Sequence, residues 1–407
     1  MKKNIYDIAI VGGGIIGLST ALQISNTYPD LRLIVLEKEG VLGLHQSSRN
    51  SGVIHSGIYY RPDSMKAKTC VSGARKMIEF AQEHNINHEI CGKVIVATNQ
   101  MQIPRLEELY KRAKANGVEG IKMIEKEELL EKEPYAKGVK ALWVPSTGII
   151  DYPGVLKTYA KLILEKGQEI KLNQSVKKIE IKKNQIYIDC NDGEFCSSYL
   201  INCAGLYADR IAGLAGAKLP VKIVPFRGEY YQIKPSKENL VNGLIYPVPD
   251  PAFPFLGVHF TKRIDGTVEA GPNAVLAFAR EGYRKNNFNF IDLMETITYG
   301  GFLKLASKYW KVGMGEMYRS FSKNAFTKAL QELLPEIQKD DLIDGGSGVR
   351  AQAIDRNGKL IDDFSIIHTE KALHVCNAPS PGATSSIAIG ETITSMLKES
   401  FPNLINS

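Results

Sequence analysis

The sequence has few cysteines, and they are not arranged as a recognisable site. Six cysteines occur among 407 residues, scattered along the chain, and none of them forms a C-x-x-C pair. Zinc sites and disulfide frameworks both need cysteines at characteristic spacings, so neither is indicated and no metal site is predicted. We expect reduced, mostly buried thiols, as in a cytoplasmic protein.

The sequence also lacks a segment apolar enough to cross a membrane. Residues 8–29 carry no charge and follow Lys2 and Lys3, which imitates a signal peptide. The run contains three consecutive glycines and several polar residues, however, and no small-x-small cleavage site ends it. Because a span needs about 20 mainly apolar residues, we expect neither export nor insertion into a bilayer.

The composition is that of an ordinary globular protein with about two domains, and the net charge of +7 is modest. The charge is uneven, because residues 300–330 contain six basic residues, one acid and six aromatic side chains. This stretch is either a solvated surface or a pair of helices that lie on an anionic membrane. Nucleic acid is not expected as a partner, because no recognised binding fold accompanies the charge.

A glycine-rich turn near the N-terminus is the most informative motif. An apolar run over residues 5–11 enters a G-x-G-x-x-G turn made by Gly12, Gly14 and Gly17, and a second apolar run ends at Glu37. Such glycines make the tight turn, let the backbone approach a pyrophosphate and let the helix pack closely on the strand. The helix N-terminus attracts phosphate, and Glu37 can accept hydrogen bonds from ribose hydroxyls. The motif predicts a dinucleotide-binding α/β unit.

The rest of the chain interrupts this unit with β-rich segments. Alternating side chains over residues 170–190 predict antiparallel strands, and residues 221–233 and 257–271 are also predicted strands. A buried strand over 199–204 and a final strand, loop and helix over 373–398 complete the dinucleotide fold. The fold class is therefore α/β (α+β overall), with a discontinuous Rossmann-like domain and an antiparallel β-rich substrate domain. The expected boundaries are 1–90, 150–215 and 340–407 for the first domain, and 91–149 and 216–339 for the second.

Several ordered blocks carry a resemblance to a known family. They are RNSGVIHSGIYY (49–60), TGIIDYP (147–153), NCAGLYAD (202–209), PFRGEYY (225–231), GVRAQ (348–352) and APSPGATSS (378–386). Over essentially the whole chain they resemble the FAD-dependent D-amino-acid-oxidase superfamily, and within it the enzymes that oxidise L-2-hydroxyglutarate.

The resemblance implies FAD as the cofactor and a small 2-hydroxy dicarboxylic acid as the substrate. The implied reaction is oxidation of L-2-hydroxyglutarate to 2-oxoglutarate by hydride transfer to flavin N5, with electrons passed to oxygen or to a membrane quinone pool. Three alternatives stay open: an amine oxidase of the glycine or sarcosine type, a related hydroxy-acid or glycerol-3-phosphate dehydrogenase, and a flavin-binding accessory protein without turnover. The expected location is the cytoplasm or the inner face of the cytoplasmic membrane. The oligomeric state is not indicated.

The residues expected to hold FAD come from several separate segments. The loop over residues 47–52 offers hydroxyl and amide groups that suit phosphate, and the final loop opens a helix whose N–H groups stabilise negative charge on the reduced flavin. The full set implied by the resemblance is Gly12, Gly14, Ile15, Ile16, Gly17, Glu37, Lys38, Ser47, Ser48, Arg49, Asn50, Ser51, Gly52, Val176, Ala204, Gly205, Gly348, Pro381, Gly382, Ala383, Thr384 and Ser385.

Two histidines and one arginine are the candidate catalytic residues. Oxidation of an alcohol needs a base, and the resemblance places His55 at the reacting face of the flavin, while His259 in an apolar strand is the rival. Arg350 resembles the arginine that clamps the substrate carboxylate in amino-acid oxidases, and a guanidinium can bind a carboxylate with two hydrogen bonds. Ala351 replaces the proline of that family motif, which leaves the rigidity of the loop open.

The remaining substrate-binding candidates are less distinct. Arg227 lies in a block common to the superfamily, so it either orders the structure or binds substrate. Four residues could receive the distal carboxylate, and the sequence does not separate them: Tyr60, Tyr246, Lys262 and Arg263.

Overall fold

The computed structural model describes residues 5–182, 184–250 and 256–405. Its helices are α1 (Ile15–Thr27), α2 (Met65–Glu83), α3 (Ile103–Ala115), α4 (Lys126–Lys132), α5 (Tyr152–Glu165), α6 (Ala208–Leu214), α7 (Phe290–Ile297), α8 (Gly300–Phe321), α9 (Lys323–Gln331), α10 (Ser386–Ser400) and α11 (Pro402–Ile405). Short 3-10 turns are η1 (Gln100–Gln102), η2 (Gly205–Tyr207), η3 (Pro235–Leu240) and η4 (Lys339–Asp341).

The strands belong to three sheets. They are β1 (Ile5–Val11), β2 (Leu33–Leu36), β3 (Val53–Ile54), β4 (His88–Glu89), β5 (Lys93–Ala97), β6 (Lys122–Glu125), β7 (Lys140–Val144), β8 (Gly148–Ile150), β9 (Glu169–Lys171), β10 (Lys178–Lys182), β11 (Gln185–Cys190), β12 (Gly193–Asn202), β13 (Val221–Ile233), β14 (Leu244–Pro247), β15 (His259–Lys262), β16 (Val268–Leu276), β17 (Leu342–Asp355), β18 (Ser365–His368) and β19 (Ala372–Asn377).

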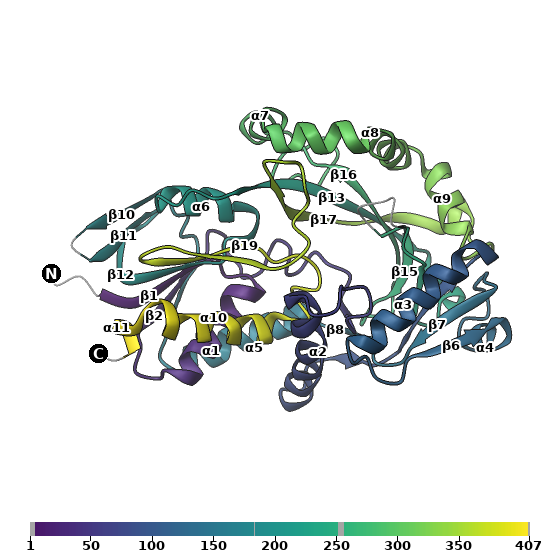
Figure 1. The fold of residues 1–407 in the computed structure, drawn as a ribbon, viewed down its shortest axis with the longest axis horizontal. Coiled ribbons are helices and arrows are strands. Elements are labelled where there is room, and N and C mark those ends of the chain that lie inside the picture. The colour runs from purple at the N-terminus through teal and green to yellow at the C-terminus, as the bar shows by residue number, and fades with distance from the viewer. Residues whose placement is uncertain (1–4, 183, 251–255, 406–407) are drawn as a thin grey trace.

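The first sheet has a parallel centre, as a dinucleotide-binding fold requires. Its order is β10-β11-β12-β1-β2-β9. Strand β19 also pairs with β12, along residues 200–202, beyond the part of β12 that pairs with β11. Strand β1 is parallel to both β12 and β2, and successive side chains of β1 enter two different apolar clusters. Burial on both faces explains why β1 and β2 are continuous apolar runs rather than alternating ones. Helices α1, α5 and α10 cover one face (Figure 1).

The second sheet is almost entirely antiparallel and forms the other lobe (Figure 1). Its order is β17-β13-β16-β15-β14-β5-β7-β6, and only β14 and β5 run parallel. The long pair β13 and β17 places Phe226 opposite Arg350 and Gly228 opposite Gly348. A small third sheet, β3-β8-β4, is antiparallel. The mixed architecture confirms the predicted fold class.

The predicted antiparallel strands over residues 170–190 are only partly right. Strands β10 and β11 form an antiparallel hairpin, but β9 lies parallel to β2 at the edge of the first sheet. The reason is that α5 is a crossover helix, so the strand after it returns in the same direction as β2. Strand β17, which was expected in the dinucleotide-binding part, pairs with β13 in the second sheet. Among the described helices, none combines the length and apolarity that a bilayer span needs.

Candidate active site

A large cavity lies between the two sheets. Its volume is about 1530 Å³, and its walls come from the β1 turn, the segment after β2, β17 and the loop before α10. Pockets for one small ligand usually measure roughly 300–1,000 Å³. This cavity therefore has room for a dinucleotide together with a small substrate.

The glycine-rich turn at one end of the cavity depends on close backbone approach. Gly12 has φ of +110°, and a Cβ atom there would lie 2.5 Å from the carbonyl oxygen of Cys203. A Cβ atom on Gly17 would lie 2.0 Å from the carbonyl oxygen of Gly12. Neither position can carry a side chain without moving the helix or the turn. Gly12, Gly14, Ile15 and Ile16 line the cavity, whereas Gly17 packs behind it.

Glu37 lies in the cavity wall as a fixed carboxylate. Its Oε2 accepts a hydrogen bond from the backbone N–H of Gly13 at 2.7 Å, and its Oε1 accepts one from the N–H of Glu39 at 2.9 Å. The side chain is buried and faces the same space as the glycine turn. An acid at the end of β2, held by backbone N–H groups beside the turn, fits the ribose position of a dinucleotide.

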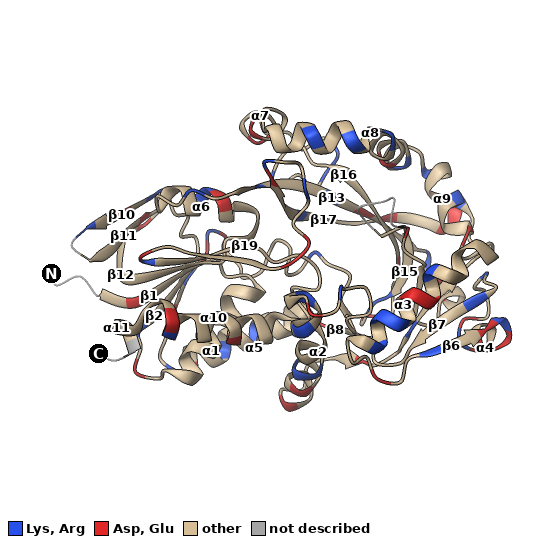
Figure 2. Ribbon diagram, viewed as in Figure 1, with Lys and Arg blue, Asp and Glu red and all other residues tan. Residues whose placement is uncertain are grey.

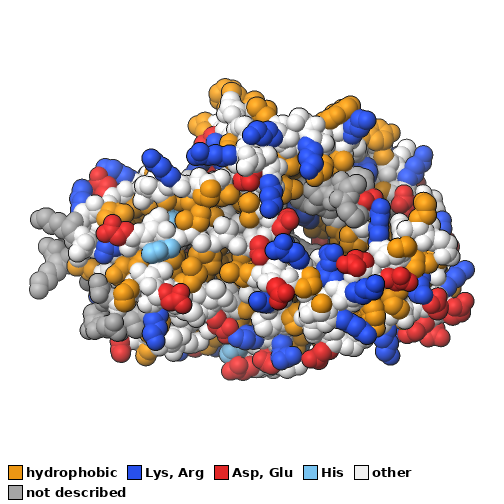
Figure 3. All heavy atoms as spheres, viewed as in Figure 1, with side chains coloured by type: hydrophobic (Ala, Val, Ile, Leu, Met, Phe, Trp, Pro, Cys, Tyr) orange, Lys and Arg blue, Asp and Glu red, His pale blue; other side chains and the backbone are white. Residues whose placement is uncertain are grey.

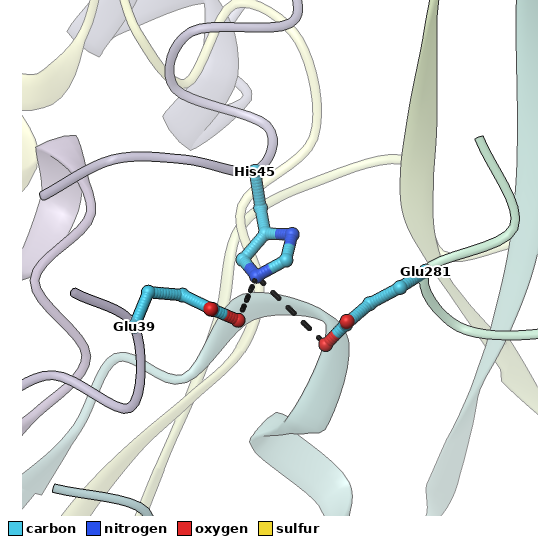
Figure 4. Close-up of side chains that lie close together, drawn as sticks. All are labelled: Glu39, His45 and Glu281. Carbon is cyan, nitrogen blue, oxygen red and sulfur yellow. Dashed lines mark hydrogen bonds and ion pairs between the residues drawn. The ribbon is translucent and has the colours of Figure 1, made fainter. Parts of the chain in front are cut away.

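A charged cluster follows Glu37 along the chain (Figure 4). His45 Nε2 lies 2.9 Å from a carboxylate oxygen of Glu39 and 3.8 Å from one of Glu281. The ammonium of Lys38 contacts both carboxylates, and the hydroxyl of Tyr207 donates to Glu281. Glu39, His45 and Glu281 together resemble a metal site. The ammonium group of Lys38, however, already supplies a positive charge to the two carboxylates.

The polar loop over residues 47–52 crosses the N-terminus of α1. Ser47 Oγ accepts a hydrogen bond from the N–H of Ile15 at 2.9 Å, and Asn50 donates to the carbonyl of Ser47. Four residues of the predicted loop line the cavity, namely Ser47, Arg49, Asn50 and Ser51. Ser48 and Gly52 are not among the lining residues.

The loop before α10 closes the opposite side of the cavity. Pro381, Gly382, Ala383 and Thr384 line it, while Ser385 is buried behind them. Thr384 Oγ1 accepts a hydrogen bond from the backbone N–H of His55 at 3.1 Å and also contacts the Tyr152 hydroxyl. One threonine therefore ties the final loop to the segment that carries His55. Tyr152 was not predicted, although it belongs to the block over residues 147–153.

The other predicted cofactor contacts fall on the same cavity. Val176, Ala204, Gly205, Lys38 and Gly348 all line it. A Cβ atom on Gly348 would lie 2.2 Å from the carbonyl oxygen of Arg49, so glycine there lets β17 approach the polar loop. The glycine turn, the helix N-terminus and the continuous cavity fit FAD.

Both candidate histidines line the cavity and are neutral. Burial lowers the pKa of His55 to about 3, and the nearby charge of Lys93 adds to this effect. Burial likewise lowers the pKa of His259 to about 3. His259 Nδ1 lies 2.8 Å from the carbonyl oxygen of Gly257, so Nδ1 donates and the lone pair is on Nε2. A neutral ring keeps a lone pair that can accept a proton, and burial makes each of these rings a weaker base than an ordinary histidine.

Arg350 and Arg227 have different surroundings. Arg350 lines the cavity on β17, and its charge opposes the rise that burial causes in the pKa of Tyr230. Arg227 is buried away from the cavity, where it pairs with Glu229 at 2.8 Å and donates to the carbonyls of Gly282 and Arg284. These contacts favour the structural interpretation of Arg227.

The structure places two of the four candidates for the distal carboxylate in the cavity wall and the other two in contacts with protein groups. Tyr60 and Tyr246 line the cavity. Lys262 faces Glu89, and Arg263 binds the carbonyl of Asn50 and the carboxylate of Glu269. No sequence pattern pointed to two further lysines near the tyrosines: Lys66, which lines the cavity, and Lys93, which is buried behind it.

Comparisons with known proteins show which family the chain belongs to. A family model described as FAD dependent oxidoreductase matches residues 7–396, so the chain belongs to this family of FAD-dependent oxidoreductases. It is 53% identical over 389 residues to the L-2-hydroxyglutarate dehydrogenase of Indibacter alkaliphilus, covering 95% of this chain and 98% of that one. It is 47% identical over 413 residues to the mitochondrial L-2-hydroxyglutarate dehydrogenase of Homo sapiens, covering 97% and 89%.

A solved structure extends the comparison to a protein with the cofactor bound. The L-alpha-glycerophosphate oxidase of Mycoplasma pneumoniae, described as dithionite reduced with FAD bound, has a TM-score of 0.80 and 25% identity, and the match covers 99% of this chain and 95% of that one. The predicted family and the predicted cofactor are confirmed.

Proposed function

We propose that the protein is an FAD-dependent dehydrogenase that oxidises L-2-hydroxyglutarate to 2-oxoglutarate. The observation that carries the proposal is the full-length similarity to L-2-hydroxyglutarate dehydrogenases, at 53% identity over 389 residues. The cavity supports it, because Arg350 and two neutral histidines line the same space beside the dinucleotide turn.

The residues of the chain have three tasks in this reaction. Arg350 binds the C1 carboxylate and fixes the orientation of C2. A neutral histidine, His55 or His259, accepts the proton of the C2 hydroxyl. FAD, when bound, supplies the acceptor for the C2 hydrogen and its electron pair.

The predicted segments that line the cavity would hold FAD. The N-terminus of α1, the β1 turn and Ser47 would receive the phosphates, and Glu37 would bind the ribose. Val176 would contact the adenine, and Pro381–Thr384 would contact the pyrimidine edge of the flavin. The first sheet with its helices forms the FAD-binding domain, and the second sheet forms the substrate domain, so we place the last domain boundary after β17.

We also propose that electrons leave to a membrane quinone through docking of α7 and α8 on an anionic membrane surface. Trp310, Met314, Tyr318 and Phe321 lie along one face of α8, and each is at least 60% exposed. Figure 3 shows hydrophobic side chains along this rim, and Figure 2 shows lysines on α8. Apolar side chains with adjacent basic residues suit an anionic lipid surface.

The proposed activity is tested by anaerobic mixing of the holoenzyme with a panel of substrates while the visible absorbance of oxidised flavin is followed. L-2-hydroxyglutarate should bleach the flavin, and D-2-hydroxyglutarate should not, because Arg350 and one histidine fix a single face of C2. Faster bleaching by glycine, sarcosine or glycerol 3-phosphate would assign the protein to another branch of the family. A flavin that no small substrate bleaches would indicate an accessory protein.

A further inference from the structure

The structure contains an unusual concentration of buried polar groups without partners beside the two histidines. Among the described residues, nine buried side-chain nitrogen or oxygen atoms have no hydrogen-bond partner by strict geometry, and four of them belong to His55, Tyr59, Lys93 and Tyr246. Of these four, the Tyr246 hydroxyl has the Thr261 side chain beside it. A buried polar group without a partner costs stability, and an unpaired buried charge costs more. Such a cluster at a cavity wall indicates a place for a ligand that supplies the missing partner.

Lys93 is the centre of this cluster. It begins β5, is 1% exposed, and no acid pairs with its ammonium group within the described residues. Its Nζ atom lies 4.8 Å from the ring centroid of Tyr59 and 4.9 Å from that of Tyr246. Both rings line the cavity, and Lys93 lies directly behind them. A cation between two phenol rings draws electron density from them and makes their hydroxyl groups stronger donors.

The substrate in the proposed function has two carboxylates, and Arg350 accounts for one. Tyr246 stacks on His259 with ring centroids 3.9 Å apart, so the phenol wall adjoins a candidate base. We propose that Tyr59 and Tyr246 bind the distal carboxylate of a dicarboxylate substrate, with Lys93 as the positioning charge behind them. This inference rests on the proposed function and names the part of the site that selects dicarboxylates.

The titration of Lys93 gives a second property of this subsite. Burial lowers the pKa of the Lys93 ammonium to about 7. The groups that face it are Tyr59, Tyr246, Cys70, His55 and His259. Below pH 7 the ammonium is charged and the dicarboxylate binds well. As the pH rises through 7 the charge is lost, and the affinity for the distal carboxylate should fall.

The test compares Lys93→Met holoenzyme with wild type on two substrates of equal chain length. L-2-hydroxyglutarate carries the distal carboxylate, and L-2-hydroxyvalerate has a methyl group in its place. The variant should raise KM for the dicarboxylate by about tenfold, the range for loss of a charge-assisted contact, with little change in kcat. The efficiency with L-2-hydroxyvalerate should change much less, so the readout is the ratio of the two efficiencies. Lys140→Met, on the neighbouring strand β7 and paired with Glu125 at the surface, is the matched control.

Binding of unreactive ligands separates this inference from the proposed activity. Glutarate and valerate are titrated into the holoenzyme and followed by the change in the flavin spectrum. Wild type should prefer glutarate, Lys93→Met and Tyr59→Phe should lose this preference, and the preference of wild type alone should decline above pH 7. An equal loss for both ligands, or an unchanged preference, would overturn the subsite. A wild type that prefers glutarate but does not oxidise L-2-hydroxyglutarate would overturn the activity and keep the subsite.

Discussion

Substitution of Gly17 by alanine should disrupt the dinucleotide site by steric overlap alone. The added Cβ atom would lie 2.0 Å from the carbonyl oxygen of Gly12 and 3.4 Å from Cβ of Cys203. The distance to the Gly12 oxygen is about 1 Å shorter than the closest approach that Cβ atoms show in proteins. Because that oxygen belongs to the backbone and cannot rotate away, α1 must move away from the β1 turn. Overpacking of this kind costs typically about 1–3 kcal/mol. We expect a lower unfolding midpoint of the flavin-free protein and loss of FAD on purification.

Substitutions of two other glycines, Gly14 and Gly213, serve as controls for the effect of Gly17→Ala. A Cβ atom on Gly14 meets only Ser47 Oγ, at 3.2 Å, a contact that a shift of a few tenths of an ångström relieves without breaking the hydrogen bond from the N–H of Ile15. Gly14→Ala should therefore keep the stability of the flavin-free protein and lose FAD retention, because the methyl group enters the cavity. Gly213 in α6 has no atom within 4 Å of its Cβ position. Gly213→Ala should be neutral or stabilising by up to about 1 kcal/mol, since alanine favours a helix.

The measurements are thermal unfolding of the flavin-free proteins and the ratio of bound FAD to protein. The expected order of flavin-free stability is Gly213→Ala at or above wild type, Gly14→Ala equal to wild type, and Gly17→Ala clearly below. A Gly17→Ala protein with the unfolding midpoint and FAD content of wild type would refute the packing argument. If Gly14→Ala retained FAD fully, the phosphates would not lie at this turn.

Two more predictions concern the cavity, and a third concerns the exposed surface of α8. Arg350→Lys keeps the charge but loses the paired hydrogen bonds, so kcat/KM for L-2-hydroxyglutarate should fall about ten- to a hundredfold while FAD content is unchanged; loss of FAD with normal turnover would place Arg350 on the cofactor. Because burial lowers the pKa of both candidate histidines to about 3, kcat/KM should not fall between pH 7 and pH 5, and a loss centred near the ordinary histidine pKa would contradict a neutral base. Trp310→Ser should weaken cosedimentation with anionic lipid vesicles, whereas Met101→Ser should not, although Met101 is more exposed (84% against 60%); equal binding of both variants would remove α8 from the membrane contact.

Most of the cavity-lining segments could be predicted from the sequence, because each dinucleotide-binding motif consists of residues that are close together in the chain. The turn at Gly12 and Gly17 is specified by residues within one strand, one turn and one helix, and the structure shows the same close contacts that the motif predicts. The start of α2 is also set locally, because Ser64 Oγ accepts a hydrogen bond from the backbone N–H of Ala67. By contrast, the direction of β9 depends on the crossover helix before it and on pairing with β2, which no local pattern encodes.

The sequence by itself indicated the family and the cofactor through ordered blocks that resemble the FAD-dependent superfamily along the whole chain. It indicated the dinucleotide-binding fold because phosphate binding requires glycines and a helix N-terminus at fixed short spacings. Only the tertiary structure decided which polar residues share the cavity. It placed Arg350 in the wall, paired Arg227 with Glu229, and brought Lys93 behind Tyr59 and Tyr246. Lys93 is separated from Tyr59 and Tyr246 by tens to more than a hundred positions, and burial lowers the pKa of its ammonium group. Burial is a property of the folded chain and not of any segment of it.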